Sequence, residues 1–195
     1  MSICPWGVAP PEYRRYHDDE WGVPVVDDVA ILEKLCLEGF QSGLSWLTIL
    51  RKRDAFRRAF KGFAPEAVAA FGARDVERLL ADASIVRHRG KIEATVANAR
   101  AVRDMHAGGE SLAALLWRHE PGGRRRGAPR AMADLPASTA ESTALSKDLR
   151  RRGFRFVGPT TAYAAMQSLG LVNDHLAGCP ARARVEALRA ALLRP

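Results

Sequence analysis

His175-Leu-Ala-Gly-Cys179 near the end of the chain, together with Cys4 and His17 near its beginning, sets the first constraint on the fold. Structural zinc takes four cysteine and histidine ligands in a tetrahedron, and two of each is a standard set. If both pairs hold one ion, nearly the whole chain becomes a single closed loop, which gives the link a large entropic effect on the unfolded state. The alternative is that the cysteines are ordinary thiols and the histidines surface groups, and the spacing leaves both interpretations open.

Composition favours one compact, intracellular domain. The chain has 195 residues, of which 47% are hydrophobic and 27% charged, so a proper core is available. The third cysteine, Cys36, lies in an apolar run, where a buried thiol is usual. Three cysteines make a poor disulfide framework, and neither a signal segment nor a membrane span is visible. We therefore expect a soluble, cytoplasmic monomer with no membrane partner.

The net charge of +8 points to a polyanionic partner, and nucleic acid is the first candidate. The alternative is a genome biased toward arginine and alanine, which would inflate basicity without any function. Charge alone does not separate the two.

Apolar residues recur with helical spacing along most of the chain, and alternating strand-like stretches are almost absent. The sequence therefore predicts an all-α fold, a bundle of short helices. The expected helices cover residues 28–39, 44–60, 65–71, 75–80, 91–105, 111–117, 143–152, 160–169 and 181–193. The run over residues 120–130 is rich in glycine, proline and arginine and predicts a surface loop.

Glu38 falls on the apolar face of the first expected helix, seven residues after Ile31 and three after Leu35. A buried carboxylate is costly unless it meets a cation or several hydrogen-bond donors. The alternative is that the helix ends near Gly39 and that Glu38 turns to solvent.

Five aromatic residues flank Glu38 or the N-terminal Cys/His pair: Trp6, Tyr13, Tyr16, Trp21 and Trp46. A carboxylate in a cage of electron-rich rings suits a flat cationic ligand, because the rings offer stacking and cation–π attraction while the carboxylate offers charge and hydrogen bonds. The alternative is that these rings simply form core, as aromatic side chains more often do.

The segment Arg87-His88-Arg89-Gly90-Lys91 joins two expected helices. A short hairpin with a glycine and several basic residues holds phosphate through backbone N–H groups and side chains, as in a helix-hairpin-helix reader of the DNA backbone. A plain solvated turn is the alternative.

Gly43-Leu44, just before Trp46, forms a small corner with an apolar tip. Such a tip can enter a duplex and fill the gap left by an extruded base. The alternative is that Leu44 only packs against its own helix.

Six stretches, in this order, resemble the bacterial 3-methyladenine-DNA glycosylase I family: Tyr16-His-Asp-Asp-Glu-Trp-Gly-Val-Pro24, Cys36-Leu-Glu-Gly39, Gly43-Leu-Ser-Trp46, Arg87-His-Arg-Gly-Lys91, Arg152-Gly-Phe-Arg-Phe-Val-Gly158 and Gly170-Leu-Val-Asn-Asp-His175. The resemblance runs from Cys4 to Cys179. That family belongs to the helix-hairpin-helix glycosylase superfamily, carries a structural zinc, and removes 3-methyladenine from alkylated DNA.

The resemblance implies roles for individual residues. It assigns the zinc to Cys4, His17, His175 and Cys179. It implies that Glu38 and Tyr16 hydrogen-bond a flipped base and that Trp46 stacks on it, with Trp6 and Trp21 as neighbouring aromatics. We expect Tyr13 to bind the substrate beside them. It also implies that Leu44, beside Gly43, fills the vacated stack. From the hairpin layout we expect the DNA backbone to contact Arg87, His88, Arg89, Gly90 and Lys91.

The resemblance also implies a mechanism. 3-Methyladenine in DNA is positively charged and departs as a neutral purine, so the enzyme need not protonate it. No lysine stands out as a Schiff-base nucleophile, so we expect hydrolysis that leaves an abasic site. Zinc with four protein ligands has no open position, which disfavours a catalytic metal. The rival interpretations are a zinc hydrolase and a zinc-stapled DNA-binding protein without activity.

For the domain organisation we expect one helical glycosylase domain over residues 1–195. Residues 1–25 and 171–180 would form a zinc-linked subregion, residues 119–131 a mobile basic loop, and residues 181–195 a basic C-terminal extension. The loop and the extension are richer in arginine than we expect for the family, which leaves DNA affinity outside the core open.

Overall fold

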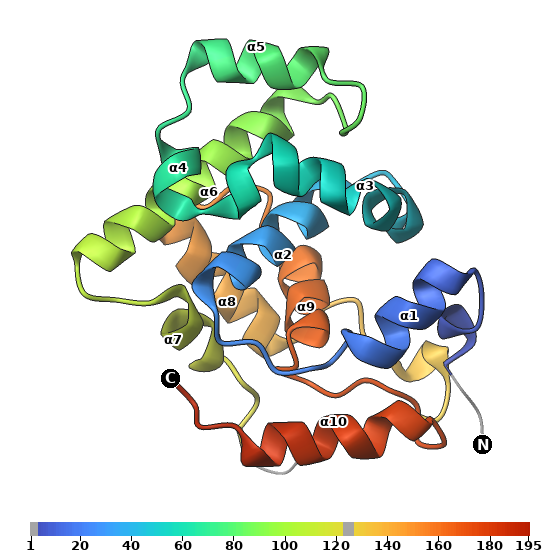
Figure 1. Ribbon diagram of the computed structural model, residues 1–195. Coiled ribbons are helices and arrows are strands. Elements are labelled where there is room, and N and C mark those ends of the chain that lie inside the picture. Colours follow the sequence, from blue (N-terminus) through green and yellow to red (C-terminus); the bar gives the residue numbers. More distant parts are fainter. Residues whose placement is uncertain (1–3, 123–126) are drawn as a thin grey trace.

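The computed structural model describes residues 4–122 and 127–195, and all regular secondary structure in these two ranges is helical (Figure 1). The all-α prediction is therefore confirmed. The longer helices are α1 (Pro11–Asp19), α2 (Asp28–Gln41), α3 (Trp46–Ala59), α4 (Pro65–Ala69), α5 (Ala73–Ala81), α6 (Arg89–Ala107), α7 (Leu112–Trp117), α8 (Ala140–Arg151), α9 (Pro159–Ser168) and α10 (Pro180–Ala191). Three short 3-10 helices are η1 (Pro5–Gly7), η2 (Lys61–Phe63) and η3 (Met132–Asp134).

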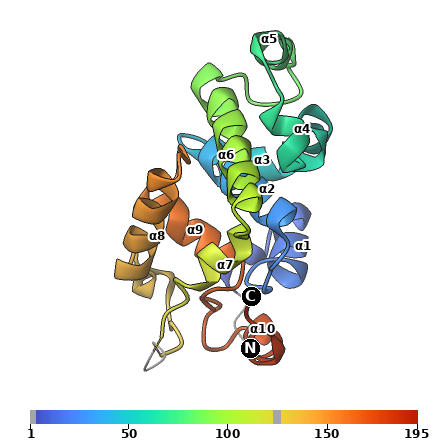
Figure 2. The ribbon, with the colours of Figure 1, turned by 90° about the vertical axis from the view of Figure 1, so that its left-hand side faces the viewer.

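Helix α2 is the centre of the bundle. It packs against α3, α6, α7 and α9, and both views show it enclosed by these helices (Figures 1 and 2). Helix α5 and the start of α6 form one end of the molecule, whereas α1 and α10 lie at the other end (Figure 1). The first and last segments of the described chain are thus neighbours.

The sequence explains why α2 forms where it does. The side chain of Asp27 caps the helix by accepting a hydrogen bond from the Ala30 N–H. The apolar residues at helical spacing, among them Ile31 and Leu35, are fully buried. The helix continues past Gly39 to Gln41, so Glu38 stays on the buried face and does not turn to solvent.

Helix α1 was not expected from the sequence. Its nine residues, Pro-Glu-Tyr-Arg-Arg-Tyr-His-Asp-Asp, are mostly polar and give no long apolar stripe. Tertiary contacts hold it instead, because Tyr16 and His17 are buried and the Tyr13 hydroxyl accepts a hydrogen bond from the Leu47 N–H. The remaining expected helices are present, with boundaries shifted by a few residues.

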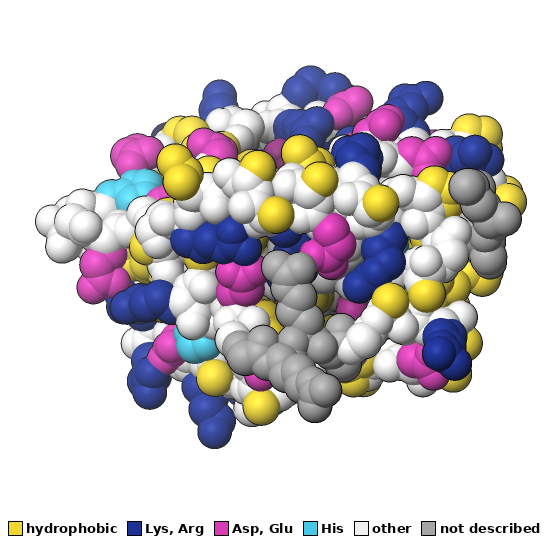
Figure 3. Space-filling view, turned by 90° about the horizontal axis from the view of Figure 1, so that it is seen from below, with side chains coloured by type: hydrophobic (Ala, Val, Ile, Leu, Met, Phe, Trp, Pro, Cys, Tyr) yellow, Lys and Arg dark blue, Asp and Glu magenta, His cyan; other side chains and the backbone are white. Residues whose placement is uncertain are grey.

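The C-terminal segment is part of the fold. Helix α10 buries Val185, and Arg189 is also buried, donating to the carbonyls of Gly170 and Leu171. On the face that carries α10, basic and acidic side chains lie side by side (Figure 3). Glu120 forms ion pairs with Arg189 and Arg194. These arginines are therefore engaged in structure and do not form a purely basic tail.

Part of the basic loop expected over residues 119–131 lies outside the described residues, namely 123–126. Beyond this gap, the N–H groups of Arg130 and Ala131 donate to the Asp134 carboxylate, which fixes the start of η3. Among the described residues, no helix has both the length and the apolar character that crossing a membrane requires.

Candidate functional site

The two Cys/His pairs meet in one buried cluster. The ligand atoms of Cys4, His17, His175 and Cys179 all lie within 4.8 Å of one another. His17 Nε2 is 3.1 Å from His175 Nδ1 and 3.4 Å from Cys179 Sγ, and Cys4 Sγ is 3.8 Å from His175 Nδ1. A tetrahedral ion with zinc bond lengths needs ligand separations of roughly 3.3–3.8 Å, so these distances fit one such ion.

The groups around the cluster also suit a metal. The second ring nitrogens are both held: His17 Nδ1 lies 2.8 Å from an Asp18 carboxylate oxygen, and His175 Nε2 lies 3.0 Å from the Trp21 carbonyl oxygen. Such contacts fix the orientation of metal-binding imidazoles. They leave one nitrogen of each ring directed at the two sulfur atoms. The four residues therefore form a group that could hold a metal ion.

Gly7 allows the N-terminal segment to reach this cluster. A Cβ atom at this position would lie 2.5 Å from the Cγ of His17, closer than packed atoms tolerate. The absence of a side chain lets η1 pass directly over the imidazole and brings Cys4 to the other three ligands.

A second feature is an open cavity of about 260 Å³ beside the cluster. This is slightly below the ~300 Å³ at which pockets for drug-sized ligands begin, so it suits one small ring system. The lining residues are Trp6, Tyr13, Tyr16, Trp21, Glu38, Gln41, Trp46, Met132, Leu135, Ala164 and Gln167. All five aromatic residues expected to form a cage are among them, and we call this cavity the base pocket.

Glu38 is the charged group of the base pocket. It is 7% exposed, and in the described parts of the chain it has no hydrogen bond or ion pair. Burial raises its pKa to about 7, and the nearby charge of Lys34 opposes this shift. A carboxyl group that is buried, unpaired and close to neutrality in pKa is ready to receive a cation or a hydrogen-bond donor.

Tyr16 and Trp46 form the wall next to Glu38. Their ring centroids are 5.4 Å apart with the planes tilted by 49°. Burial, together with the Glu38 charge, raises the pKa of the Tyr16 hydroxyl well above its ordinary value, so the hydroxyl keeps its proton. Trp46 Nε1–H is buried without a hydrogen-bond partner in the described structure.

Two further rings join the base pocket to the Cys/His cluster. The Trp6 ring lies 5.1 Å from the His17 ring and 5.0 Å from the Trp21 ring, each in an edge-on arrangement. Trp21 in turn lies 4.7 Å from the His175 ring. The aromatic wall of the pocket therefore rests directly on the two histidines.

The corner before Trp46 is exposed, as expected. Leu44 is 42% exposed, and Gly43 has φ of 82°, a backbone conformation that favours glycine. The corner connects α2 to α3, so an apolar tip projects between the helices that carry Glu38 and Trp46.

The basic hairpin is divided in its roles. Arg87 is exposed and has no ion pair among the described residues. His88 is also exposed and caps α6, because its Nδ1 lies 3.3 Å from the Lys91 backbone nitrogen. Arg89 pairs with Glu77 at 2.7 Å. Gly90 lies in the first turn of α6.

Lys91 does not project from the hairpin as a phosphate ligand would. It is 7% exposed, and its ammonium donates to the carbonyls of Phe40 at 2.8 Å and Ser42 at 2.5 Å. It therefore ties the start of α6 to the end of α2, next to the exposed corner. The expected phosphate contact by Lys91 conflicts with this geometry, because its donors point inward.

Sequence reasoning missed several residues at the base pocket. Met132 and Leu135 reach it from the segment around η3, and Ala164 and Gln167 reach it from α9, one helical turn apart. The most consequential omission is Lys34, whose ammonium donates to the Tyr16 hydroxyl at 2.9 Å. Lys34 lies one turn before Glu38 on the same face of α2, which was the only available signal.

Comparison with known proteins gives one consistent family. Residues 6–183 match the methyladenine glycosylase family. The chain is 48% identical to DNA-3-methyladenine glycosylase 1 of Escherichia coli K12, over 92% of this chain and 96% of that protein. A crystal structure of a 3-methyladenine DNA glycosylase I superposes with a TM-score of 0.88 at 47% identity, over 92% of this chain and 98% of that one. A structure of 3-methyladenine DNA glycosylase I from Staphylococcus aureus, which describes recognition of 3-methyladenine, superposes with a TM-score of 0.86 at 39% identity. The superposition covers 93% of this chain and 97% of that one.

Proposed function

The chain belongs to the methyladenine glycosylase family, and on this basis we propose that it excises 3-methyladenine from alkylated DNA by hydrolysis, leaving an abasic site. The observation that carries the proposal is the buried, unpaired Glu38 in an aromatic pocket. An isolated carboxylate among rings suits a flat base that carries a positive charge.

In the reaction, the bond between the base nitrogen and C1′ of the sugar breaks, and its electron pair stays on the base. The base therefore leaves as a neutral purine, while a water oxygen bonds to C1′ and the water proton passes to solvent. The residues of the pocket need not protonate the base. Their task is to select the cationic base and to hold it once it has left the helix.

For that task we propose specific roles. Glu38 supplies negative potential and accepts hydrogen bonds from the base, and the protonated Tyr16 hydroxyl forms a further hydrogen bond. Trp46 stacks on the base, while Trp6, Tyr13 and Trp21 close the pocket around it. Since the pocket is small, a bulky lesion would fit poorly.

We propose that the metal of the Cys/His cluster is a structural zinc, one per chain. The donor set and the separations fit zinc, and when bound it would cross-link the two ends of the fold. All four positions of a tetrahedral ion are filled by Cys4, His17, His175 and Cys179, so no open position is left for substrate. The metal then supports the pocket without taking part in the reaction.

For the DNA we propose a helix-hairpin-helix mode of binding. Arg87, His88, Arg89 and Gly90 lie between or at the ends of α5 and α6, where backbone N–H groups and side chains can meet phosphates. Leu44 would enter the duplex at the corner held by Gly43 and fill the gap left by the flipped nucleotide.

We further propose that residues 1–195 act as one domain, with residues 1–25 and 171–180 linked through the zinc. The monomeric state and the cytoplasmic location expected from the sequence stay predictions.

The direct test is release of labelled base from methylated duplex DNA by the purified protein. We expect free 3-methyladenine and abasic sites in equal amounts, with no strand cleavage by the protein itself. A folded, zinc-loaded protein that binds duplex DNA but releases no base would contradict the proposal. It would favour a DNA-binding protein without activity.

A further inference from the structure

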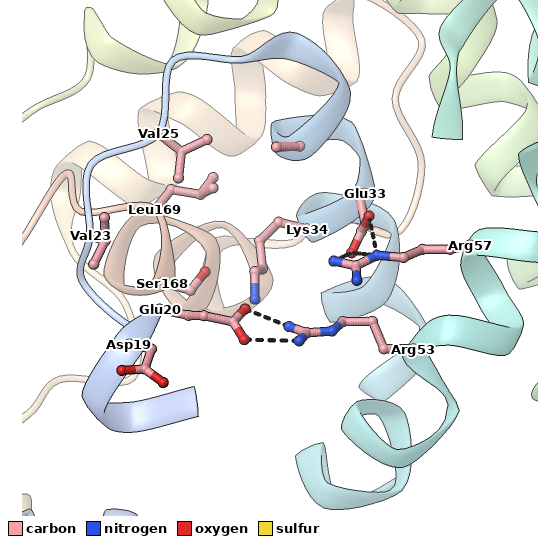
Figure 4. Close-up of a pocket in the computed structure, with 11 residues that line it drawn as sticks. Asp19, Glu20, Val23, Val25, Glu33, Lys34, Arg53, Arg57, Ser168 and Leu169 are labelled. Atoms are coloured by element: carbon pink, nitrogen blue, oxygen red, sulfur yellow. Dashed lines mark hydrogen bonds and ion pairs between the residues drawn. The ribbon is translucent and has the colours of Figure 1, made fainter. Parts of the chain in front are cut away.

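Lys34 lies directly behind the wall of the base pocket. Its ammonium donates to the Tyr16 hydroxyl at 2.9 Å and lies 4.6 Å from the ring centroids of both Tyr16 and Trp46. Lys34 lines a neighbouring cavity of about 240 Å³ and not the base pocket itself (Figure 4). The two rings that would hold the base thus have a lysine on their other side.

Apart from exposed Asp19, the other charged residues that line this neighbouring cavity are paired. Arg53 and Glu20 form two parallel contacts at 2.5 and 2.8 Å, and Arg57 approaches Glu33 at 2.8 Å (Figure 4). Exposed Asp19 also lines the cavity.

Apart from exposed Asp19, two charged residues that line the two cavities have no ion-pair partner among the described residues: Lys34 and Glu38. They lie one helical turn apart on α2. Each acts on the pKa of the other, so each lies within the electrostatic range of the other. A cationic base in the base pocket would therefore be attracted by Glu38 and repelled by Lys34, and both residues come from α2.

Resting on the proposed function, we propose that Lys34, behind the wall of the base pocket, promotes base release through its charge. Its ammonium opposes the positive charge of an intact 3-methyladenine nucleotide more strongly than it opposes the transition state of base release. Lys34 would then weaken ground-state binding of the damaged nucleotide and favour its conversion.

The physical reason is the movement of charge during the reaction. In the bound nucleotide, the positive charge lies on the base, next to Tyr16, Trp46 and the ammonium behind them. As the bond to C1′ lengthens, electrons flow to the base and the positive charge moves to the sugar, farther from Lys34. An interaction that is unfavourable in the ground state and weaker in the transition state raises kcat, because it lowers the barrier between them.

Lys34 also has the titration behaviour that this role requires. Burial lowers its pKa to about 8, against the attraction of Glu38. Several charged or titratable groups surround the Lys34 ammonium. They come from α2 itself and from the neighbouring α1 and α3 regions: Tyr16, Glu20, Glu33, Glu38, Arg53 and Arg57. The opposing charge is present below pH 8 and disappears as the pH rises through that value.

The test compares kcat and KM for base release from methylated duplex DNA at pH 7.5 and pH 9. Lys34→Met removes the charge and keeps an unbranched side chain, whereas Lys34→Arg keeps a charge at both pH values. Lys147→Met, on the exposed face of α8, is the matched control for loss of one lysine charge. Tryptophan fluorescence with free, neutral 3-methyladenine reports whether the pocket is intact.

At pH 7.5 we expect Lys34→Met to lower KM by about ten-fold, as for a like charge removed several ångström from the ligand, and to lower kcat as well. Raising the pH to 9 should move the wild type toward Lys34→Met and leave Lys34→Arg unchanged. Binding of free 3-methyladenine should stay near the wild-type value in Lys34→Met.

Three results would overturn the inference. The first is an active wild type whose kcat and KM are matched by Lys34→Met. The second is loss of free-base binding in Lys34→Met, which would give Lys34 a merely structural role. The third is a wild type that binds but never releases base, which would remove the proposed function and this inference with it.

Discussion

The Trp21 indole packs edge-on against the His175 imidazole, with ring centroids 4.7 Å apart, and the Trp21 carbonyl oxygen lies 3.0 Å from His175 Nε2. One residue therefore contacts the candidate metal cluster through its backbone and ring and lines the base pocket with the same ring. Any loss of order at His175 would reach the pocket through this contact.

The first prediction concerns the metal. Cys179→Ser should lower the zinc content, measured by atomic absorption, and lower the thermal stability, because it removes one of four ligands. A loss of about 3 kcal/mol corresponds to a fall in Tm of roughly 6–12 °C for a chain of this size. Cys36→Ser, at a buried cysteine outside the cluster, is the control for loss of a thiol. Wild type that keeps its full Tm after metal removal would contradict the structural role.

The second prediction concerns Glu38 and stability. The folded pKa of about 7 lies above the ordinary value of 4.5, so the folded state binds the proton more tightly than the unfolded state. Glu38 therefore favours folding fully below pH 4.5, and this contribution is lost as the pH rises to about 7. The shift corresponds to about 3 kcal/mol at most.

Glu38→Gln removes this titration and keeps the size of the side chain. We expect the variant to gain Tm relative to wild type at pH 8 and to show little gain at pH 4.5. The same change should weaken the preference for 3-methyladenine over adenine in DNA, since the attracting charge is gone. A wild type and a variant with parallel Tm curves from pH 4.5 to 8 would show that Glu38 is not buried as a charged group.

The third prediction separates two residues of the basic hairpin. Lys91→Met leaves the buried Phe40 carbonyl without its donor, which costs about 1–3 kcal/mol, and also removes the hydrogen bond to the Ser42 carbonyl. It should therefore lower Tm. Exposed Arg87 has no such partners, so Arg87→Ala should keep Tm and weaken binding to any duplex.

The salt dependence distinguishes the two effects. Arg87→Ala should reduce the slope of log affinity against log salt by roughly one unit, as for the loss of one phosphate contact. If Lys91→Met reduced the slope by as much and left Tm unchanged, the inward orientation of Lys91 would be wrong in solution.

The sequence predicted most of the bundle because its helices carry apolar residues at regular spacing. In α2 the same periodicity placed Glu38 on the buried face, and the structure confirms this. Helix α1 escaped prediction because a polar segment becomes helical only when Tyr16 and His17 are buried by other elements. Local pattern holds no information about such tertiary stabilisation.

Lys34 and Lys91 show the same limit. A lysine in a helix is normally solvated, and the only sequence signal for either was the position of Lys34 one turn before Glu38. Lys34 becomes enclosed only when α1 and α3 bring Tyr16, Glu20 and Arg53 around it. The Cys/His cluster could be predicted because these residue types are rare and chemically specific, whereas lysines are common and require three-dimensional context.

The last prediction concerns Leu44. Its side chain is 42% exposed at the tip of the corner, so Leu44→Ala removes little buried surface and should leave Tm close to that of wild type. The base pocket does not include Leu44, so free 3-methyladenine should bind normally. Release of base from duplex DNA should slow, because the extruded nucleotide loses the side chain that fills its place in the stack.

A matched substrate separates this wedge role from a loss of DNA affinity. In single-stranded methylated DNA there is no intact stack to fill, so Leu44→Ala should act on it at nearly the wild-type rate. Exposed Leu188 on α10 offers a control, since Leu188→Ala removes the same atoms far from the corner. Equal slowing on both substrates would show that Leu44 contributes to general DNA contact, because a wedge acts only where a base pair has been opened.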